Sequence, residues 1–477
     1  MSRTAPLAST APAPAEPLSA AIARHAIATP FDRLPDSATS AAIAVALDTL
    51  AVAWAGTTAP GAVETRDHAL DQGGKPEAEI WGHGARLPAA SAAFVNGVAA
   101  AALDYDTVNI AAVVHSDIVV LPAVLAVAQR EHASGRAFLA ALTLGNDIAG
   151  RLARTTTAHS GWFYTSIHGI FAAAAASARL LGLGERQTVD ALGIALSSVG
   201  GTQQPMAERS LTKRLQSAFA AEAGVRAALL AQRGIGGPAG SIDGRFGLYA
   251  LYEAGDPAPF RDGLGERFEN GGFTFKKFPT CACGHAPTQA ALDLAADHAI
   301  DPDEITAIRI ALTPYSHRLV GAPFAPDPNP QVTAQFSVQY QVASALLRRR
   351  LGLAELEETA VRDPRIAALV ARSSVEIRDE PGVDRLLPAE VTVVTARRGA
   401  FTRKVALLPG SPEAPLSDAE RRAKFADATG RGLRPLDPAA RDRLHRRLTG
   451  IARLGDVADL FTGLQDSQFQ DPQGDRA

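Results

Sequence analysis

Residues 121–153 read LPAVLAVAQREHASGRAFLAALTLGNDIAGRLA, and this stretch decides the fold class. Its apolar residues recur near the helical period, which is typical of amphipathic or buried helices. Residues 37–56 and 171–183 show the same Ala- and Leu-rich pattern, and helical signals continue from about Leu18 to Tyr252. Small residues on so many faces predict helices that approach one another closely. We therefore expect the first half of the chain to form a large helical bundle or array.

The pattern changes near Gly271. Residues 335–353 remain helical in pattern, but they are flanked by segments of a different kind. Three segments alternate apolar and polar residues, as half-buried strands do: 305–314, 373–381 and 389–410. The last of these contains ARRGA at the expected hairpin turn. Strand, helix, strand and strand predict a smaller α+β domain over residues 271–411.

The remaining segments complete the predicted organisation. Residues 412–464 are helical in pattern but too short to form a domain alone, so we expect them to pack on the first domain. Residues 1–19 are rich in Ala, Pro and Ser and predict a disordered arm, and the polar residues 465–477 predict a disordered tail. The predicted fold class is mainly α: a large all-α domain over residues 20–270, completed by the C-terminal helices, with an inserted α+β lid domain.

Composition excludes several classes of protein. A formal charge of −3 over 477 residues argues against nucleic acid as an electrostatic partner. No apolar run is long and clean enough to predict a membrane span, and the N-terminus lacks the apolar core of a secretion signal. The two cysteines, in the run CACGH, cannot build a disulfide framework and are weak support for zinc. We predict a cytoplasmic protein with no metal site.

Four stretches combine small residues with titratable ones. Each has an ordinary structural explanation: a carboxylate can cap a helix, a threonine can bond its own turn, and adjacent cations can belong to a solvated helix turn. Their joint occurrence favours a site instead. The candidates are Asp104 and His115; Tyr164, Thr165 and His168 ahead of an Ala-rich helix; Lys213 and Arg214; and Lys276, Lys277 and His285.

These stretches resemble the MmgE/PrpD family, which includes 2-methylcitrate dehydratase, cis-aconitate decarboxylase and iminodisuccinate epimerase-like proteins. The family's motifs occur in order along residues 20–464. They are L-D-F-D-D-T…H-P followed by V-L-P, matched by Leu103, Asp104, Tyr105, Asp106, Thr107, His115 and Val120-Leu121-Pro122, with Ser116 in place of the proline; T-K-R/P-L-H, matched by Thr212-Lys213-Arg214-Leu215, with Gln216 in place of the histidine; K-P-Y-P-x-C-x-x-x-H, matched by Lys276, Phe278, Pro279, Cys281 and His285; and F-S-x-x-Y-x-V-A, matched from Phe336 through Tyr340 to Ala343.

The resemblance implies a homodimer whose site lies between the two domains and handles a small di- or tricarboxylate without a cofactor. By matched position it implies roles for Asp104, Thr107, His115, Lys213 and His285. We assign proton transfer to His115 and His285, charge stabilisation to Lys213, and orientation of a donor or substrate hydroxyl to Asp104. The predicted substrate-binding residues are Thr107, Thr165, His168, Lys276, Lys277 and Tyr340.

One departure from the family pattern concerns the site directly. Family members place a histidine two residues after the glycine of G-F/W-H, whereas Phe163 occupies that position here, with His159 and His168 nearby in sequence. Three functions stay open at this point. A lyase for a 2-methylcitrate- or cis-aconitate-like acid is the leading hypothesis, followed by an epimerase of an imino- or amino-dicarboxylate and a non-catalytic carboxylate-binding relative.

Overall fold

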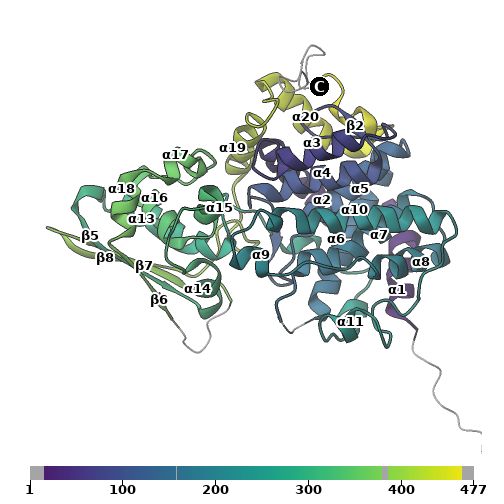
Figure 1. Ribbon diagram of the computed structural model, residues 1–477, viewed down its shortest axis with the longest axis horizontal. Helices are drawn as coiled ribbons and strands as arrows, with labels where there is room; N and C mark the ends of the chain where they lie inside the picture. Colours follow the sequence, from purple (N-terminus) through teal and green to yellow (C-terminus); the bar gives the residue numbers. More distant parts are fainter. Residues whose placement is uncertain (1–15, 157, 159, 379–384, 465–477) are drawn as a thin grey trace, which may run out of the picture.

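The computed structural model describes residues 16–156, 158, 160–378 and 385–464 (Figure 1). The predicted tail and most of the predicted arm lie outside these ranges. The main helices of the first half pack around one large apolar core. They are α1 (Leu18–Ala28), α2 (Asp36–Gly56), α3 (Ala62–Gln72), α4 (Ala89–Ala102), α5 (Asp117–Arg130), α6 (Gly135–Thr155), α7 (Tyr164–Leu180), α8 (Glu185–Leu196) and α10 (Thr212–Gln232), with the short α9 (Gln204–Ala207), α11 (Leu248–Leu251) and α12 (Ala258–Arg261).

Small residues set the spacing of the central helices. A Cβ added to Gly224 of α10 would lie 2.6 Å from the Cβ of Ala173 on α7, and one added to Gly97 of α4 would lie 3.0 Å from the Cα of Ala218 on α10. No larger side chain fits at these crossings without a shift of the helices. The Ala- and Gly-rich pattern therefore packs helices at close range, as the sequence indicates.

A second apolar core joins residues between Phe278 and Leu408. Its four-stranded sheet has the order β6-β5-β7-β8, in which β5 runs parallel to β6 and antiparallel to β7. Helix α13 packs on β7 and β8, and α16 packs on α13 (Figure 1). The elements are β5 (Ile305–Leu312), β6 (Ser373–Ile377), β7 (Ala389–Thr395), β8 (Gly399–Val405), α13 (His285–Asp297), α14 (Pro314–Val320), α15 (Pro330–Gln335), α16 (Val338–Arg348), α17 (Glu358–Val361) and α18 (Pro364–Val370).

The predicted fold class is confirmed, and each of the predicted strand segments contains a strand. The chain is mainly helical, with one small α+β part. Residues of β7 alternate between buried and half-buried, so the period-2 pattern in the sequence corresponds to one face on the core. Two-residue strands add two pairings that the sequence did not predict: β1 (Ala78–Glu79) with β2 (Arg86–Leu87), and β3 (Val108–Asn109) with β4 (Phe273–Thr274). An isolated bridge also joins Asn109 to Val114.

The last helices return to the first core. Helices α19 (Asp418–Thr429) and α20 (Pro438–Thr449) pack on α2, and their buried residues join the first apolar cluster. The indole N–H of Trp54 donates to the carbonyl oxygen of Arg434 at 2.7 Å. Thr57 accepts the N–H of Leu433 at 2.8 Å. Helix α2 is long and apolar enough to cross a membrane, and most of its apolar window is buried inside this packing.

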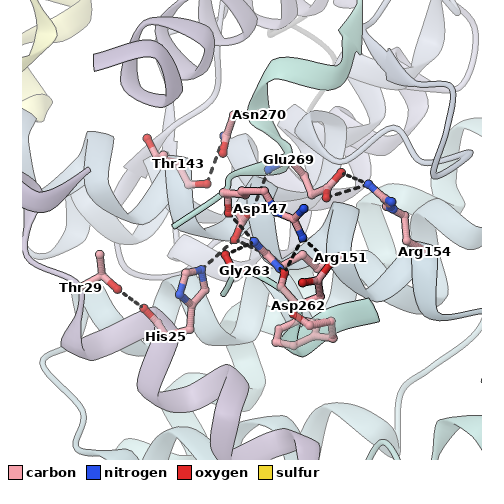
Figure 2. Close-up of polar contacts among 12 residues, drawn as sticks. His25, Thr29, Thr143, Asp147, Arg151, Arg154, Asp262, Gly263, Glu269 and Asn270 are labelled. Carbon is pink, nitrogen blue, oxygen red and sulfur yellow. Dashed lines mark hydrogen bonds and ion pairs between the residues drawn. The ribbon is translucent and has the colours of Figure 1, made fainter. Parts of the chain in front are cut away.

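A buried guanidinium on α6 holds the connection between the two cores (Figure 2). Arg151 donates to the carbonyl oxygens of Asp262 at 2.9 Å and of Gly263 at 3.1 Å, and its Nε lies 2.9 Å from the Asp147 carboxylate. The other Asp147 oxygen accepts the N–H of Glu269 at 2.7 Å. Charge-assisted bonds to backbone carbonyls are strong. They fix the chain just before β4, which leads into the second core.

Candidate functional site

A cavity of about 120 Å³ lies between residues of the two apolar cores. Its helical side comes from the α4–α5 connection, the start of α7, α9 and the start of α10. Its other side comes from the chain after β4, from α14, and from the residues before β7. Polar lining residues are Asp104, Asp106, His115, Gln203, Lys213, Lys276 and Arg385. Apolar and aromatic ones are Val108, Ile110, Val113, Ile118, Trp162, Phe163, Tyr164, Met206, Cys281, Ala282, Cys283, Tyr315, Leu319, Phe336 and Leu386.

The α4–α5 connection carries the acidic side of the site. Asp104 follows the end of α4 in the left-handed region, at φ +50°, a conformation that Asp tolerates better than most residues. His115 Nδ1 lies 2.7 Å from Oδ2 of Asp106, so the imidazole and the carboxylate are paired. The backbone N–H of His115 donates to the Thr165 hydroxyl at 3.0 Å. Asp106 thus holds the imidazole through Nδ1, and Thr165 holds the backbone of the same residue.

Two lysines meet these carboxylates. Lys213, at the start of α10, contacts the Asp104 carboxylate. Lys276 Nζ lies 3.2 Å from Asp104 Oδ2 and 3.5 Å from Asp106 Oδ1, and it donates to the Asp104 carbonyl oxygen at 2.8 Å. Pairing of this kind is what allows such charges to be buried.

The cluster shifts the pKa of each of its buried members. Burial alone would raise the pKa of Asp104, but Lys213 and Lys276 outweigh it and hold that pKa well below its usual range. Burial would also raise the pKa of Asp106, but Lys276 and His115 outweigh it and lower that pKa to about 2. The two carboxylates raise the pKa of Lys276 against the effect of its burial. All three groups are therefore charged at neutral pH.

Thr107 lies behind the cavity, where it donates to Asp117. The Thr107 hydroxyl is 3.0 Å from Asp117 Oδ2, and Asn146 donates to Asp117 Oδ1 at 2.6 Å. Asp117 is fully buried at the start of α5. Burial, reinforced by the nearby Asp106 and Asp48, raises the pKa of Asp117 to about 7 despite these two bonds.

Asp117 should make stability fall with rising pH. The Asp117 carboxyl has a pKa of about 3.9 in the unfolded chain and about 7 in the folded chain. Its protonated form therefore adds to the free energy of unfolding at low pH, and this contribution is lost as pH rises from about 4 to 7. Asp117→Asn removes the titration. We expect wild type to lose about 1–3 kcal/mol more free energy of unfolding than the variant between pH 5 and pH 8, measured by urea denaturation. Parallel losses in the two proteins would contradict the assignment.

Four of the ten predicted site residues line the cavity: Asp104, His115, Lys213 and Lys276. Thr165 is buried beside it and fixes the backbone of His115. His168 is buried farther along α7, where its Nε2 lies 3.3 Å from the Thr156 hydroxyl, and it does not line the cavity. His159 lies outside the described residues. His168 therefore does not take the place of a cavity side chain at Phe163.

Two other predicted substrate-binding residues, Lys277 and Tyr340, lie outside the cavity. Lys277 lies 3.1 Å from the Glu420 carboxylate at the surface, because adjacent residues of the extended chain point in different directions. Tyr340 is buried in the second core, where its hydroxyl donates to the carbonyl oxygen of Glu355. Neither side chain lines the cavity, and this placement does not favour direct substrate contact.

His285 is fully buried and does not line the cavity. Its Nε2 lies 3.2 Å from the carbonyl oxygen of Thr280, and its Nδ1 has no hydrogen-bond partner within the described parts of the chain. Burial, with a smaller effect from Lys276, lowers the pKa of His285 to about 3. The imidazole is therefore neutral at physiological pH, with one ring nitrogen able to accept a hydrogen bond.

The structure adds residues that motif matching did not single out as site residues. Asp106 lines the cavity with Asp104. Its position two residues after Asp104 was the feature of the sequence that could have identified it as a site residue. Arg385 reaches the cavity from the residues before β7. Lys424 of α19 donates to the carbonyl oxygens of Tyr105 at 2.8 Å and Lys276 at 3.0 Å. Nothing near Arg385 or Lys424 in sequence indicates that either one approaches this site.

The arrangement suits proton transfer beside a carboxylate. An imidazole fixed by a carboxylate can exchange a proton, and ammonium groups can bind an anion or stabilise charge that develops next to it. A hydrogen bond from Cys283, opposed by burial, lowers the pKa of Cys281 at the cavity wall. Across the described ranges, no three His, Cys, Asp or Glu side chains converge in a way that could hold a metal ion.

Comparison with known proteins matches both halves of the chain. Residues 20–261 match the MmgE/PrpD N-terminal domain, and residues 278–448 match the MmgE/PrpD C-terminal domain. The chain is 29% identical over 396 residues to "Cis-aconitate decarboxylase" of Homo sapiens, across 80% of this chain and 81% of that protein. It is 27% identical over 435 residues to the Mus musculus protein of the same name, across 87% and 86%. For the protein of that name from Aspergillus terreus, identity is 25% over 351 residues, across 69% and 71%.

Proposed function

The chain belongs to the MmgE/PrpD family, and from this premise we propose that it is a lyase that removes carbon dioxide or water from a small di- or tricarboxylate. The observation that carries the proposal is the His115–Asp106 pair facing the same cavity as the Lys213–Asp104 pair. Relatives named cis-aconitate decarboxylase support a substrate of this kind.

His115 is the proposed proton carrier. In decarboxylation, the bond to the departing carboxylate breaks, its electron pair moves into the substrate, and a substrate carbon takes up a proton. In dehydration, a proton leaves the carbon next to a carboxylate, the bond to the hydroxyl breaks, and the hydroxyl departs as water after taking up a proton. Both reactions need one fixed acid–base group near neutral pH, and Asp106 orients His115 for that role.

The lysines supply the positive charge that these steps need. Proton removal beside a carboxylate places negative charge on the carboxylate oxygens, and a positioned ammonium group stabilises that charge. Lys276 is enclosed by Asp104 and Asp106, whereas Lys213 touches only Asp104 of the two. We therefore assign the contact with the reacting carboxylate to Lys213.

Product analysis tests the proposal. The purified protein is incubated in deuterated solvent with citrate, 2-methylcitrate, cis-aconitate and aspartate-like acids, and products are followed by NMR. New alkene or carbon dioxide is the expected result. Deuterium incorporation without net conversion would instead identify an epimerase, and ligand-induced stabilisation without either would identify a binding protein.

Lys213→Ala should lower turnover about a hundred- to a thousandfold, by analogy with loss of an oxyanion-hole donor, or roughly 2.7–4 kcal/mol of barrier. Lys213→Arg should not restore turnover fully, because a planar guanidinium does not replace a compact ammonium. Lys277→Ala removes the same charge from a lysine outside the cavity and is the matched control. Near-normal turnover in Lys213→Ala would show that this residue is not part of the machinery.

A further inference from the structure

Two cysteines stand in the wall of the cavity, and the proposed lyase reaction uses neither of them. Cys281 and Cys283 both line the cavity, and the chain contains no other cysteine. Cys281 is partly exposed, whereas Cys283 is buried. A partly exposed thiol beside a second thiol is the arrangement typical of a cysteine that is oxidised reversibly and of its resolving partner.

The backbone brings the two cysteines close enough for a bridge. Cys281 immediately precedes a 3₁₀ turn, Ala282–Gly284, so Ala282 between the cysteines is helical. One helical residue places the Cα atoms on either side of it about 5.4 Å apart, within the roughly 4.4–6.8 Å that disulfides span. The N–H of Cys281 donates to the carbonyl oxygen of Gln335 at 3.0 Å, which holds the start of the turn. A bridge therefore requires rotation of side chains rather than a new path of the backbone.

The surroundings make Cys281 the more reactive of the two. The Cys283 thiol donates a hydrogen bond to Cys281, and this bond lowers the pKa of Cys281 although burial and Asp104 oppose it. Lys276 acts in the same direction as the hydrogen bond. The same bond and burial raise the pKa of Cys283 well above its usual value. Because the thiolate is the form that reacts with oxidants, Cys281 should react first.

We propose that Cys281 is a site of reversible oxidation by hydrogen peroxide and that Cys283 resolves the oxidised form as a disulfide. The sulfur of Cys281 attacks one peroxide oxygen: an S–O bond forms, the O–O bond breaks, and the departing hydroxide takes up a proton and leaves as water. The sulfur of Cys283 then attacks the sulfenic sulfur: the S–S bond forms, the S–O bond breaks, and the oxygen leaves as a second water. Two thiols and one peroxide give one disulfide and two waters.

The bridge should lower turnover because it forms in the wall of the cavity. The cavity measures only about 120 Å³, so a displaced side chain in its wall changes how a substrate fits. The charge that Cys281 carries as a thiolate also raises the pKa of Lys276, and a disulfide removes that charge. The effect on turnover rests on the proposed lyase function, whereas formation of the bridge does not.

Counting thiols tests the bridge on the full chain. The reduced protein is treated with hydrogen peroxide, denatured, alkylated with iodoacetamide and measured by mass spectrometry, and peptide mapping locates the modification. We expect wild type to lose both alkylatable thiols, with a change of about −2 Da in the peptide that holds the two cysteines. Dithiothreitol should restore both thiols.

Two variants separate the roles of the pair. In Cys283→Ser no resolving thiol remains, so dimedone should trap Cys281 as the sulfenic acid. In Cys281→Ser the buried Cys283 should stay reduced, and dimedone should not label the chain. Turnover of each protein is compared with that of its own untreated sample. Wild type should lose most of its turnover and recover it with dithiothreitol, whereas Cys281→Ser should retain it.

Met206 also lines the cavity and needs a separate control. Dithiothreitol does not reduce methionine sulfoxide readily, so recovery of turnover distinguishes the bridge from oxidation of Met206. Two free thiols in peroxide-treated wild type would overturn the proposal, and so would equal dimedone labelling of the two variants. A bridge that leaves turnover unchanged would overturn the effect on catalysis alone. If no acid is turned over, the lyase function fails, and the thiol count still decides whether the bridge forms.

Discussion

His115→Gln is expected to lower turnover about 10²- to 10⁴-fold, the range that a positioned acid–base group contributes. The variant keeps a polar side chain of similar length but cannot exchange a proton near neutral pH. His115 is suited to this role because its Nδ1 is 2.7 Å from Asp106 and its side chain remains 23% exposed at the cavity. The measurement is kcat on whichever acid the product analysis identifies.

The chain offers a matched control on its surface. His132 also pairs through Nδ1 with an aspartate, at 2.8 Å from Asp456, but its side chain is 71% exposed and lies away from the cavity. His132→Gln should leave turnover unchanged. Asp106→Asn should lower kcat in the same direction as His115→Gln, because an amide no longer favours the same imidazole tautomer. Equal turnover in His115→Gln and His132→Gln would remove the imidazole from the proposed mechanism.

Periodicity was sufficient for the fold class. The alternation in residues 389–410 corresponds to the antiparallel pair β7 and β8, in which Val391 and Val393 are fully buried, and the Ala-rich segments form the closely packed α4, α7 and α10. These patterns report which side of an element is buried. They do not report which element lies opposite, so the two-residue pairing of β3 with β4, which aligns Val108 with Thr274, was not predictable.

The site was predictable only in part, for a related reason. Motif matching singled out Asp104, His115, Lys213 and Lys276, which the structure places around one cavity. It could not separate Lys276 from its neighbour Lys277, because two adjacent lysines have the same chemistry and differ only in the direction of their side chains. Arg385 was not found because no local pattern marks a residue that reaches the cavity from a distant segment.

Lys424 is another residue whose role could not be predicted, because its partner is far away in the sequence. It lies on α19, yet its ammonium is 2.8 Å from Asp48 on α2, a residue 376 positions earlier. It also donates to the carbonyl oxygens of Tyr105, at 2.8 Å, and of Lys276, at 3.0 Å. Tyr105 lies between the two aspartates of the cavity. The buried ammonium of Lys424 therefore joins α2 and α19 to the segment that carries Asp104 and Asp106 and to the segment that carries Lys276.

Lys424→Met is expected to lower the free energy of unfolding by about 3–5 kcal/mol, the usual cost of removing one partner of a buried ion pair. Burial raises the pKa of Asp48 and lowers that of Lys424, so each depends on the other to stay charged. Urea denaturation measures the loss. Lys404→Met, at an exposed position of β8, should change stability by less than about 0.5 kcal/mol.

A double variant separates the ion pair from the backbone contacts of Lys424. Asp48→Leu combined with Lys424→Met leaves no stranded charge, so part of the lost stability should return. The carbonyl oxygens of Tyr105 and Lys276 still lack their donor, and each unsatisfied group costs about 1–3 kcal/mol. We therefore expect incomplete recovery of stability, and turnover below that of wild type because both segments carry groups of the cavity. Full recovery of both would mean that Lys424 serves only to neutralise Asp48.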